Sequence, residues 1–105
     1  MPGRKPKPIK TRPFDPANYL DSDEAIAAYI EDALEEGDAA SIADALGVVA
    51  RAKGMAKIAG KTGRGRESLY KALSAEGNPE FATIIAVIRA LGLRLAVVPA
   101  EAKSS

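Results

Sequence analysis

The side chains available for chemistry in this 105-residue chain are lysines, arginines, carboxylates and hydroxyls, because the sequence contains no cysteine and no histidine. Without cysteine there are no disulfides and no thiolate metal sites. Without histidine the commonest general base and the commonest metal ligand are also missing. No pair of carboxylates stands in a pattern typical of a catalytic pocket. We therefore expect a binding protein that is not an enzyme and uses no cofactor and no metal.

The charged residues are segregated along the chain. Residues 4–12 carry only lysine and arginine, residues 15–44 carry only aspartate and glutamate, and residues 51–71 are basic except for Glu67. This distribution predicts one acidic and one basic face that serve two different partners, whereas the alternative is ordinary solvated helix faces. No apolar run reaches the roughly 20 residues that span a membrane. No secretory signal opens the chain, so we expect a cytoplasmic protein without membrane contact.

The stretch "TGRGRESLYKAL" (62–73) places a glycine-rich turn with two arginines before a helical pattern. A phosphate-binding loop has a similar composition, and "GKT" (60–62) matches the end of that motif. However, the motif needs four residues between its first glycine and the Gly-Lys pair, whereas Gly54 precedes Gly60 by five intervening residues. The preceding segment also reads as the end of a helix and not as a buried strand. The sequence therefore does not support a nucleotide-hydrolysing loop.

The same stretch fits a helix-turn-helix. Its two helices cross closely, which requires a small residue on the inner face of the first helix and a residue that tolerates positive φ in the turn. Ala59 and Gly63 satisfy these two needs, four residues apart. The predicted core of the motif is Ile58, Ala59, Gly63, Leu69 and Ala72.

The outer face of the second helix carries hydrogen-bonding side chains at its N-terminal end, where a recognition helix meets base edges. We predict base contacts from Arg66, Glu67, Ser68 and Lys71. We predict contacts to the DNA backbone from Lys53, Lys57, Lys61, Arg64 and Asn78. The alternative interpretation is a helical hairpin with a solvated basic face.

Five helices are expected to position these residues. Ser22 or Asp21 caps a first helix that ends at Gly37, and Asp38 caps a second that ends at Gly54. A third helix covers about residues 55–61, a fourth covers about residues 66–75, and a fifth has Asn78 as its N-cap and Pro79 at its first position before it ends at Gly92.

After the fifth helix the composition is typical of a strand over residues 93–99. Leu93, Leu95 and Val97 alternate, and the strand has no partner within the chain. An unpaired edge favours pairing with a second copy across a two-fold axis, and the alternative is an extended tail packed on the helices.

We expect a flexible basic arm over residues 1–16, a domain over residues 17–99 and a tail over residues 100–105.

Several segments together resemble the addiction-module antidote proteins, which are HigA-like antitoxins with a Cro/Xre-type helix-turn-helix. The resemblance covers about residues 11–100 and lies in "TRPFDPANYL" (11–20), "AIAAYIEDALEEGD" (25–38), "LGVVARAKGMAKIA" (46–59), "ESLYKALSAEGNPEFATI" (67–84) and "ALGLRLAV" (90–97). It implies an all-α, five-helix, lambda-repressor-like domain whose C-terminal strand pairs across a homodimer. It also implies an antitoxin of a type II module that neutralises a RelE/ParE-superfamily toxin and represses its own operon by binding double-stranded operator DNA.

The sequence departs from the family pattern in the turn. An apolar residue and a Ser or Thr cap are usual there, whereas Arg64 and Gly65 occupy these positions. We expect Arg64 to point outward to the DNA backbone, because burying an unpaired guanidinium is costly.

Two surfaces are candidates for toxin binding. One is the acidic first helix with Asp23, Glu31, Asp32, Glu35 and Glu36, and the other is the basic arm "GRKPKP" (3–8). Two other functions stay open: a stand-alone phage-repressor-like regulator without a toxin, and an interaction module whose basic face fits an acidic partner.

Overall fold

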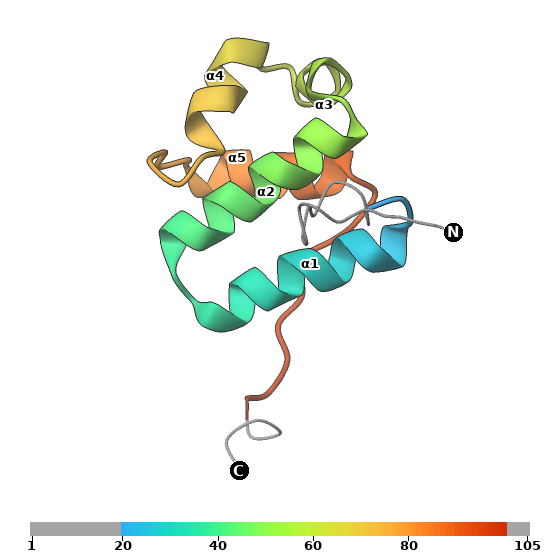
Figure 1. Cartoon of the computed structure of the whole chain (residues 1–105), viewed down its shortest axis with the longest axis vertical. Helices are drawn as coiled ribbons and strands as arrows, with labels where there is room; N and C mark the ends of the chain where they lie inside the picture. Colours follow the sequence, from blue (N-terminus) through green and yellow to red (C-terminus); the bar gives the residue numbers. More distant parts are fainter. Residues whose placement is uncertain (1–19, 101–105) are drawn as a thin grey trace, which may run out of the picture.

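The computed structural model describes residues 20–100, and five α-helices account for most of this range (Figure 1). They are α1 (Asp23–Glu36), α2 (Ala39–Lys53), α3 (Met55–Thr62), α4 (Arg66–Ala72) and α5 (Phe81–Ala90). The expectation of an all-helical fold with five helices is confirmed. The basic arm predicted over residues 1–16 lies outside the described residues. None of the helices within residues 20–100 combines the length and apolar character needed to cross a membrane.

The first two helices begin and end at the residues that the sequence indicates. The Ser22 hydroxyl accepts a hydrogen bond from the Ala25 amide at 3.1 Å, and Gly37 ends α1 in the left-handed region with φ 73°. The Asp38 carboxylate accepts hydrogen bonds from the amide and the hydroxyl of Ser41, at 3.0 and 2.9 Å. These side chains satisfy amides that a helix leaves free in its first turn. The N-terminal ends of α1 and α2 are therefore fixed by local hydrogen bonds.

Helix α2 is the centre of the fold. It packs against each of the other four helices, whereas α1 contacts no helix other than α2 among the described elements (Figure 1). The completely buried side chains of the core come from all five helices and from the residue after α4: Ile26, Leu46, Val49, Ile58, Leu69, Leu73 and Val87. On the α1 side, burial raises the pKa of the Tyr29 phenol, the Asp44 carboxylate raises it further and Arg51 opposes the shift.

Helix α2 and the end of α4 approach each other closely at Gly47. This glycine is buried, and a β-carbon added to it would overlap the backbone carbonyl oxygen of Leu73. Three further positions of α2 carry small buried side chains: Ala43, Ala45 and Ala50. Small residues on α2 therefore allow the other helices to surround it closely.

The structure corrects two predicted helix boundaries. Helix α4 stops at Ala72, about three residues earlier than predicted, because Leu73 leaves helical geometry with φ −96° and ψ 62°. A turn follows, in which the Gly77 amide donates to the Ser74 carbonyl at 2.9 Å. The prediction of Asn78 as N-cap and Pro79 as first residue of the fifth helix was wrong. The N-cap is Glu80, which forms no side-chain capping bond, and α5 begins at Phe81.

The physical reason is that residues 77–80 are needed to cross from the turn to α5. Gly77 packs so tightly against the carbonyls of Lys71 and Ala72 that no side chain fits there. A proline also disfavours helical geometry in the residue before it, and Asn78 lies outside the helix. The residues "NPE" therefore form a connection without regular secondary structure, in which Glu80 is extended.

Helix α5 ends as expected, but the strand predicted after it is not confirmed. Gly92 takes φ 84°, and the Leu93 amide donates to the Ile88 carbonyl at 3.1 Å. Within the described range, residues 93–100 adopt no regular secondary structure. Leu93 is half-buried, Leu95 is 37% exposed and Val97 is 96% exposed, so these three side chains do not share one buried face. A strand needs a neighbouring backbone, and within residues 20–100 no backbone pairs with this segment.

Candidate nucleic-acid interface

The turn between α3 and α4 is built around the carbonyl of Ala59. This oxygen accepts the amides of Gly63 and Arg64 and the hydroxyl of Thr62, the last two both at 3.2 Å. Gly63 ends α3 with φ 72°, a conformation that a residue with a side chain rarely adopts. The chain then passes through Gly65, which is extended, and α4 begins at Arg66. Both glycines thus contribute to a short reversal that sets α4 against α3.

The inner face of this helix pair is apolar. Ile58, Ala59 and Leu69 are buried, while Ala72 is only half-buried. Leu73, directly after α4, is completely buried and anchors the C-terminal end of the helix. Ala72 was predicted as a core residue of the motif, and Leu73 was not. The regular helical spacing on which that prediction depends does not extend past Ala72.

The outer face of α4 is polar and open to solvent. Arg66, Glu67, Ser68 and Lys71 are all exposed, as a surface that reads base edges would require. Tyr70 is 44% exposed beside them. The helix therefore has two sharply different sides, with leucines in the core and charged or hydroxyl side chains outward.

Arg64 lies differently from the expectation. Its guanidinium Nη1 donates to the Thr62 carbonyl at 3.1 Å, and the side chain is half-buried against the end of α3. In this position a cation also meets the negative end of the α3 dipole. Arg64 shares a hollow of about 300 Å³ with Ser68, Asn78 and Thr83. The turn, α4 and the connection before α5 thus bring three predicted DNA-contacting residues together.

Three of the predicted backbone contacts gather elsewhere. Lys53, Lys57 and Lys61 line a second hollow, of about 160 Å³, between the α2–α3 side and the C-terminal end of α5. Arg89, from the last turn of α5, completes its rim. None of these four cations is paired with an acidic side chain among residues 20–100. We call this group the four-cation hollow, and its unbalanced charge favours an anion.

Arg89 was not among the predicted site residues. Its only signal in the sequence is that it is the single basic residue at the end of an otherwise apolar helix. Its contribution depends on the packing of α5 against α3, which no local pattern reveals.

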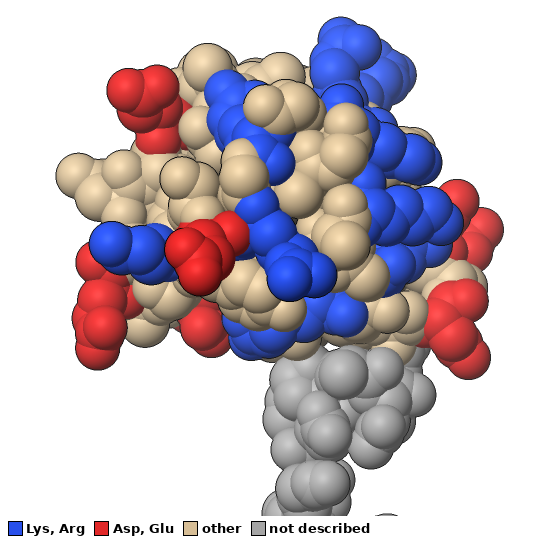
Figure 2. Space-filling view, turned by 90° about the horizontal axis from the view of Figure 1, so that it is seen from above, with Lys and Arg blue, Asp and Glu red and all other residues tan. Residues whose placement is uncertain are grey.

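Viewed from the α3–α4 end of the molecule, the basic side chains form a band. Figure 2 shows lysine and arginine spread over this face, with most acidic side chains at its margins. Such a band provides the sequence-independent attraction that phosphate backbones need. The exposed acidic residues of α1 belong to another region, since α1 contacts neither α3 nor α4 (Figure 1).

The fold and these surfaces define a small all-helical protein with a basic face on α3 and α4 and an acidic helix apart from it. Over residues 10–99 the chain matches the family described as "Probable addiction module antidote protein". A protein of Haemophilus influenzae, itself described only as uncharacterized, is 48% identical over 84 residues, which cover 80% of this chain and 87% of that protein. No solved structure matches the chain. The chain belongs to the family of probable addiction module antidote proteins, and such an antidote implies a toxin partner.

Proposed function

We propose that this protein is the antitoxin of a type II toxin–antitoxin module, neutralises a toxin of the RelE/ParE superfamily and represses its own operon. The family assignment carries the antitoxin part of the proposal. The repressor part is supported by α3, the glycine turn and α4, which we interpret as a Cro/Xre-type helix-turn-helix with a buried inner face and an exposed polar outer face. In this function the protein binds and does not catalyse, and it acts in the cytoplasm where its DNA lies.

In the proposed DNA complex, α4 enters the major groove and the exposed Arg66, Glu67, Ser68 and Lys71 meet base edges. The four-cation hollow and the Arg64–Asn78 region flank α4 and would contact phosphates on either side. Operators are read by two-fold symmetric dimers, so a second copy is part of the proposal.

We place the dimer contact at residues 93–97. No backbone hydrogen bond to another described residue is formed by Arg94–Val98, so the polar edge of this segment is available for pairing. Val97, 96% exposed, would bury apolar surface on pairing. Sedimentation equilibrium of the full chain measures the dimer directly.

The experiment that tests the function is co-expression. The small reading frame adjacent to this one is expressed alone and together with this chain, and growth and co-purification are scored. Growth arrest that this protein relieves, with a stable complex, is the expected result. No growth arrest and no complex would contradict the antitoxin function and leave a stand-alone repressor without a toxin.

Replacing Arg89 by alanine is expected to weaken binding to every DNA duplex alike, by about fivefold. The residue lines the four-cation hollow and reaches no base in the proposed complex. Its loss should therefore reduce the slope of log K against log salt concentration by about 0.9. The measurement is fluorescence anisotropy with the DNA upstream of its own reading frame and with an unrelated duplex, over a range of salt concentrations.

Arg51→Ala is the matched control for Arg89→Ala. Arg51 is an exposed arginine of α2 that lines none of the hollows described here and lies near Tyr29 of α1. It should change neither the affinity nor the salt slope. Equal effects of the two substitutions would show that only net charge matters, and the four-cation hollow would lose its role.

A further inference from the structure

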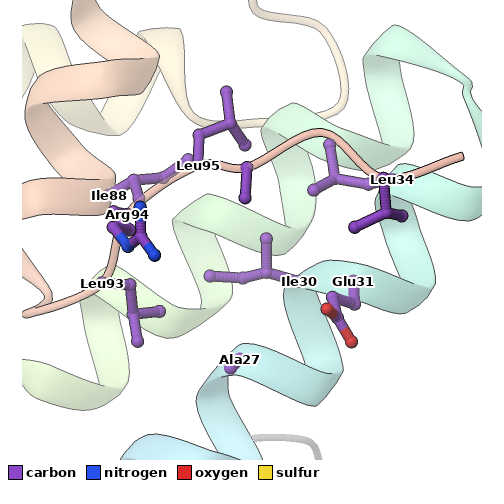
Figure 3. Close-up of a pocket in the computed structure, with 10 residues that line it drawn as sticks. Ala27, Ile30, Glu31, Leu34, Ile88, Leu93, Arg94 and Leu95 are labelled. Atoms are coloured by element: carbon purple, nitrogen blue, oxygen red, sulfur yellow. The ribbon is translucent and has the colours of Figure 1, made fainter.

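An apolar groove runs between α1 and the C-terminal segment, and nothing in the DNA-binding proposal uses its α1 wall. It has a volume of about 190 Å³. Figure 3 shows Ala27, Ile30 and Glu31 on the α1 side and Leu93, Arg94 and Leu95 on the other. Its walls are therefore aliphatic, with one carboxylate and one guanidinium among them.

The apolar lining is open to solvent. Leu34 and Leu95 are each 37% exposed, and Val98, at the end of the groove, is 76% exposed. Aliphatic side chains exposed singly are common, but a continuous strip that lines a groove is typical of an interaction site. A partner that places aliphatic side chains here would remove this strip from water.

The charge around the groove selects between partners. Helix α1 carries Glu31 on the groove wall and acidic residues along the rest of its length, and it contains no lysine or arginine: Asp23, Glu24, Glu31, Asp32, Glu35 and Glu36. In a two-fold contact through α1, each copy would bring the same acidic residues to the interface. Carboxylates facing carboxylates disfavour such a contact. A partner with lysine and arginine around an aliphatic segment is complementary to it.

We propose that this groove binds the module's toxin, through a toxin segment that combines aliphatic side chains with lysine or arginine. The aliphatic side chains lie between Leu34 and Leu95, and the toxin's cations pair with Glu31 and its acidic neighbours on α1. The inference rests on the proposed antitoxin function and adds the location and the chemistry of the toxin contact.

The position of α1 in the fold agrees with this role. Among the helices α1 contacts α2 alone, and its groove side faces the C-terminal segment and Ile88 of α5, so a partner can bind there without displacing α3 or α4. Toxin and DNA therefore occupy separate surfaces, and the protein can hold both at once. Backbone pairing at residues 93–97 would use the polar edge of the segment, whereas its leucine side chains line the groove.

Two matched pairs of variants of the full chain test the location. Glu31→Lys changes a residue of the groove wall, and Asp32→Lys makes the same charge change on the neighbouring residue of α1, which does not line the groove. Leu34→Gln makes the groove polar, and Phe81→Gln alters an exposed apolar residue of α5 that does not line it. The affinity for the protein encoded by the adjacent reading frame is measured by titration calorimetry.

We expect Glu31→Lys to weaken the complex by about 10- to 100-fold and Leu34→Gln by about tenfold. Both control variants should stay within about threefold of the unmodified chain. Thermal unfolding should be unchanged in all four variants, since each altered residue is exposed. DNA affinity should be unchanged in the three variants of α1, because α1 contacts neither α3 nor α4.

Equal weakening by Glu31→Lys and Asp32→Lys would overturn the proposal, because the overall acidity of α1 would then explain binding without the groove. A Leu34→Gln variant that becomes monomeric while it keeps its toxin affinity would also overturn it and would assign the groove to a contact between copies. If the unmodified chain does not bind the neighbouring protein at all, the antitoxin function itself fails, and the groove proposal fails with it.

Discussion

Replacing Gly47 by alanine is expected to destabilise the protein by about 3 kcal/mol. The added β-carbon would overlap the Leu73 carbonyl oxygen, which belongs to the backbone and has no alternative rotamer. Helix α2 and the end of α4 would have to separate, and that shift would reach the neighbouring core residues Leu46 and Leu69. For a domain of this size the melting temperature should fall by at least about 10 °C, measured by circular dichroism.

Gly60→Ala is the matched control, with an effect of opposite sign. Gly60 lies inside α3, is exposed and has no atom within 4 Å of the position of an added β-carbon. Alanine is a better helix former than glycine, so this variant should be more stable by about 0.5–1 kcal/mol. A Gly47→Ala protein as stable as the Gly60→Ala protein would contradict the close approach of α2 and α4.

The second large effect is expected at the outer face of α4. Lys71→Ala should weaken binding to the operator by about 1–3 kcal/mol if the ammonium group contacts a base, and binding to unrelated DNA should change little. Lys71 is exposed and the Leu69 and Leu73 anchors are untouched, so the fold should be unaffected. The measurement is the ratio of affinities for the upstream DNA and for an unrelated duplex.

Two other outcomes give Lys71 a different role. If both affinities fall alike and the salt slope decreases by about one, Lys71 contacts phosphate and not a base. If neither affinity changes, Lys71 lies outside the interface, and the orientation proposed for α4 in the groove is wrong. Arg51→Ala, on α2, is again the control for the loss of one positive charge.

The parts of the fold that local chemistry decides were predicted from the sequence. Ser22 and Asp38 cap their helices, and Gly37, Gly63 and Gly92 take the positive φ expected at helix ends. In each case one side chain or one glycine fixes the result within a few residues. The same local rules gave the five-helix order.

The predictions that failed concern segments whose conformation depends on distant contacts. The sequence "NPE" has a strong local preference for starting a helix, but the tight packing of Gly77 against the end of α4 leaves it as an irregular connection. Leu93, Leu95 and Val97 alternate like a strand, but a strand requires a second backbone, and none pairs with this segment within residues 20–100.

At the candidate site, the polar residues of α4 could be predicted from the sequence. The clusters of basic residues beside α4 could be predicted only in part. Lys57 and Lys61 are four residues apart in α3, so a shared face was predictable for these two. Lys53 ends α2 and Arg89 lies in α5, and they join the group only because both helices pack against α3. Arg64 was expected to point outward to the DNA backbone, and its guanidinium donates to the Thr62 carbonyl at the end of α3.

Helix α4 is fixed to the fold by Leu69 and Leu73, while Arg66, Glu67, Ser68 and Lys71 have no part in the core. Substitutions at these four exposed positions should therefore change the free energy of unfolding little. The four residues can vary during evolution without loss of the fold. If they read the operator as proposed, a duplicated copy of the module can acquire a new operator by a few such changes while its scaffold stays the same. Sister modules within one genome can in this way escape cross-regulation without first passing through an unfolded intermediate.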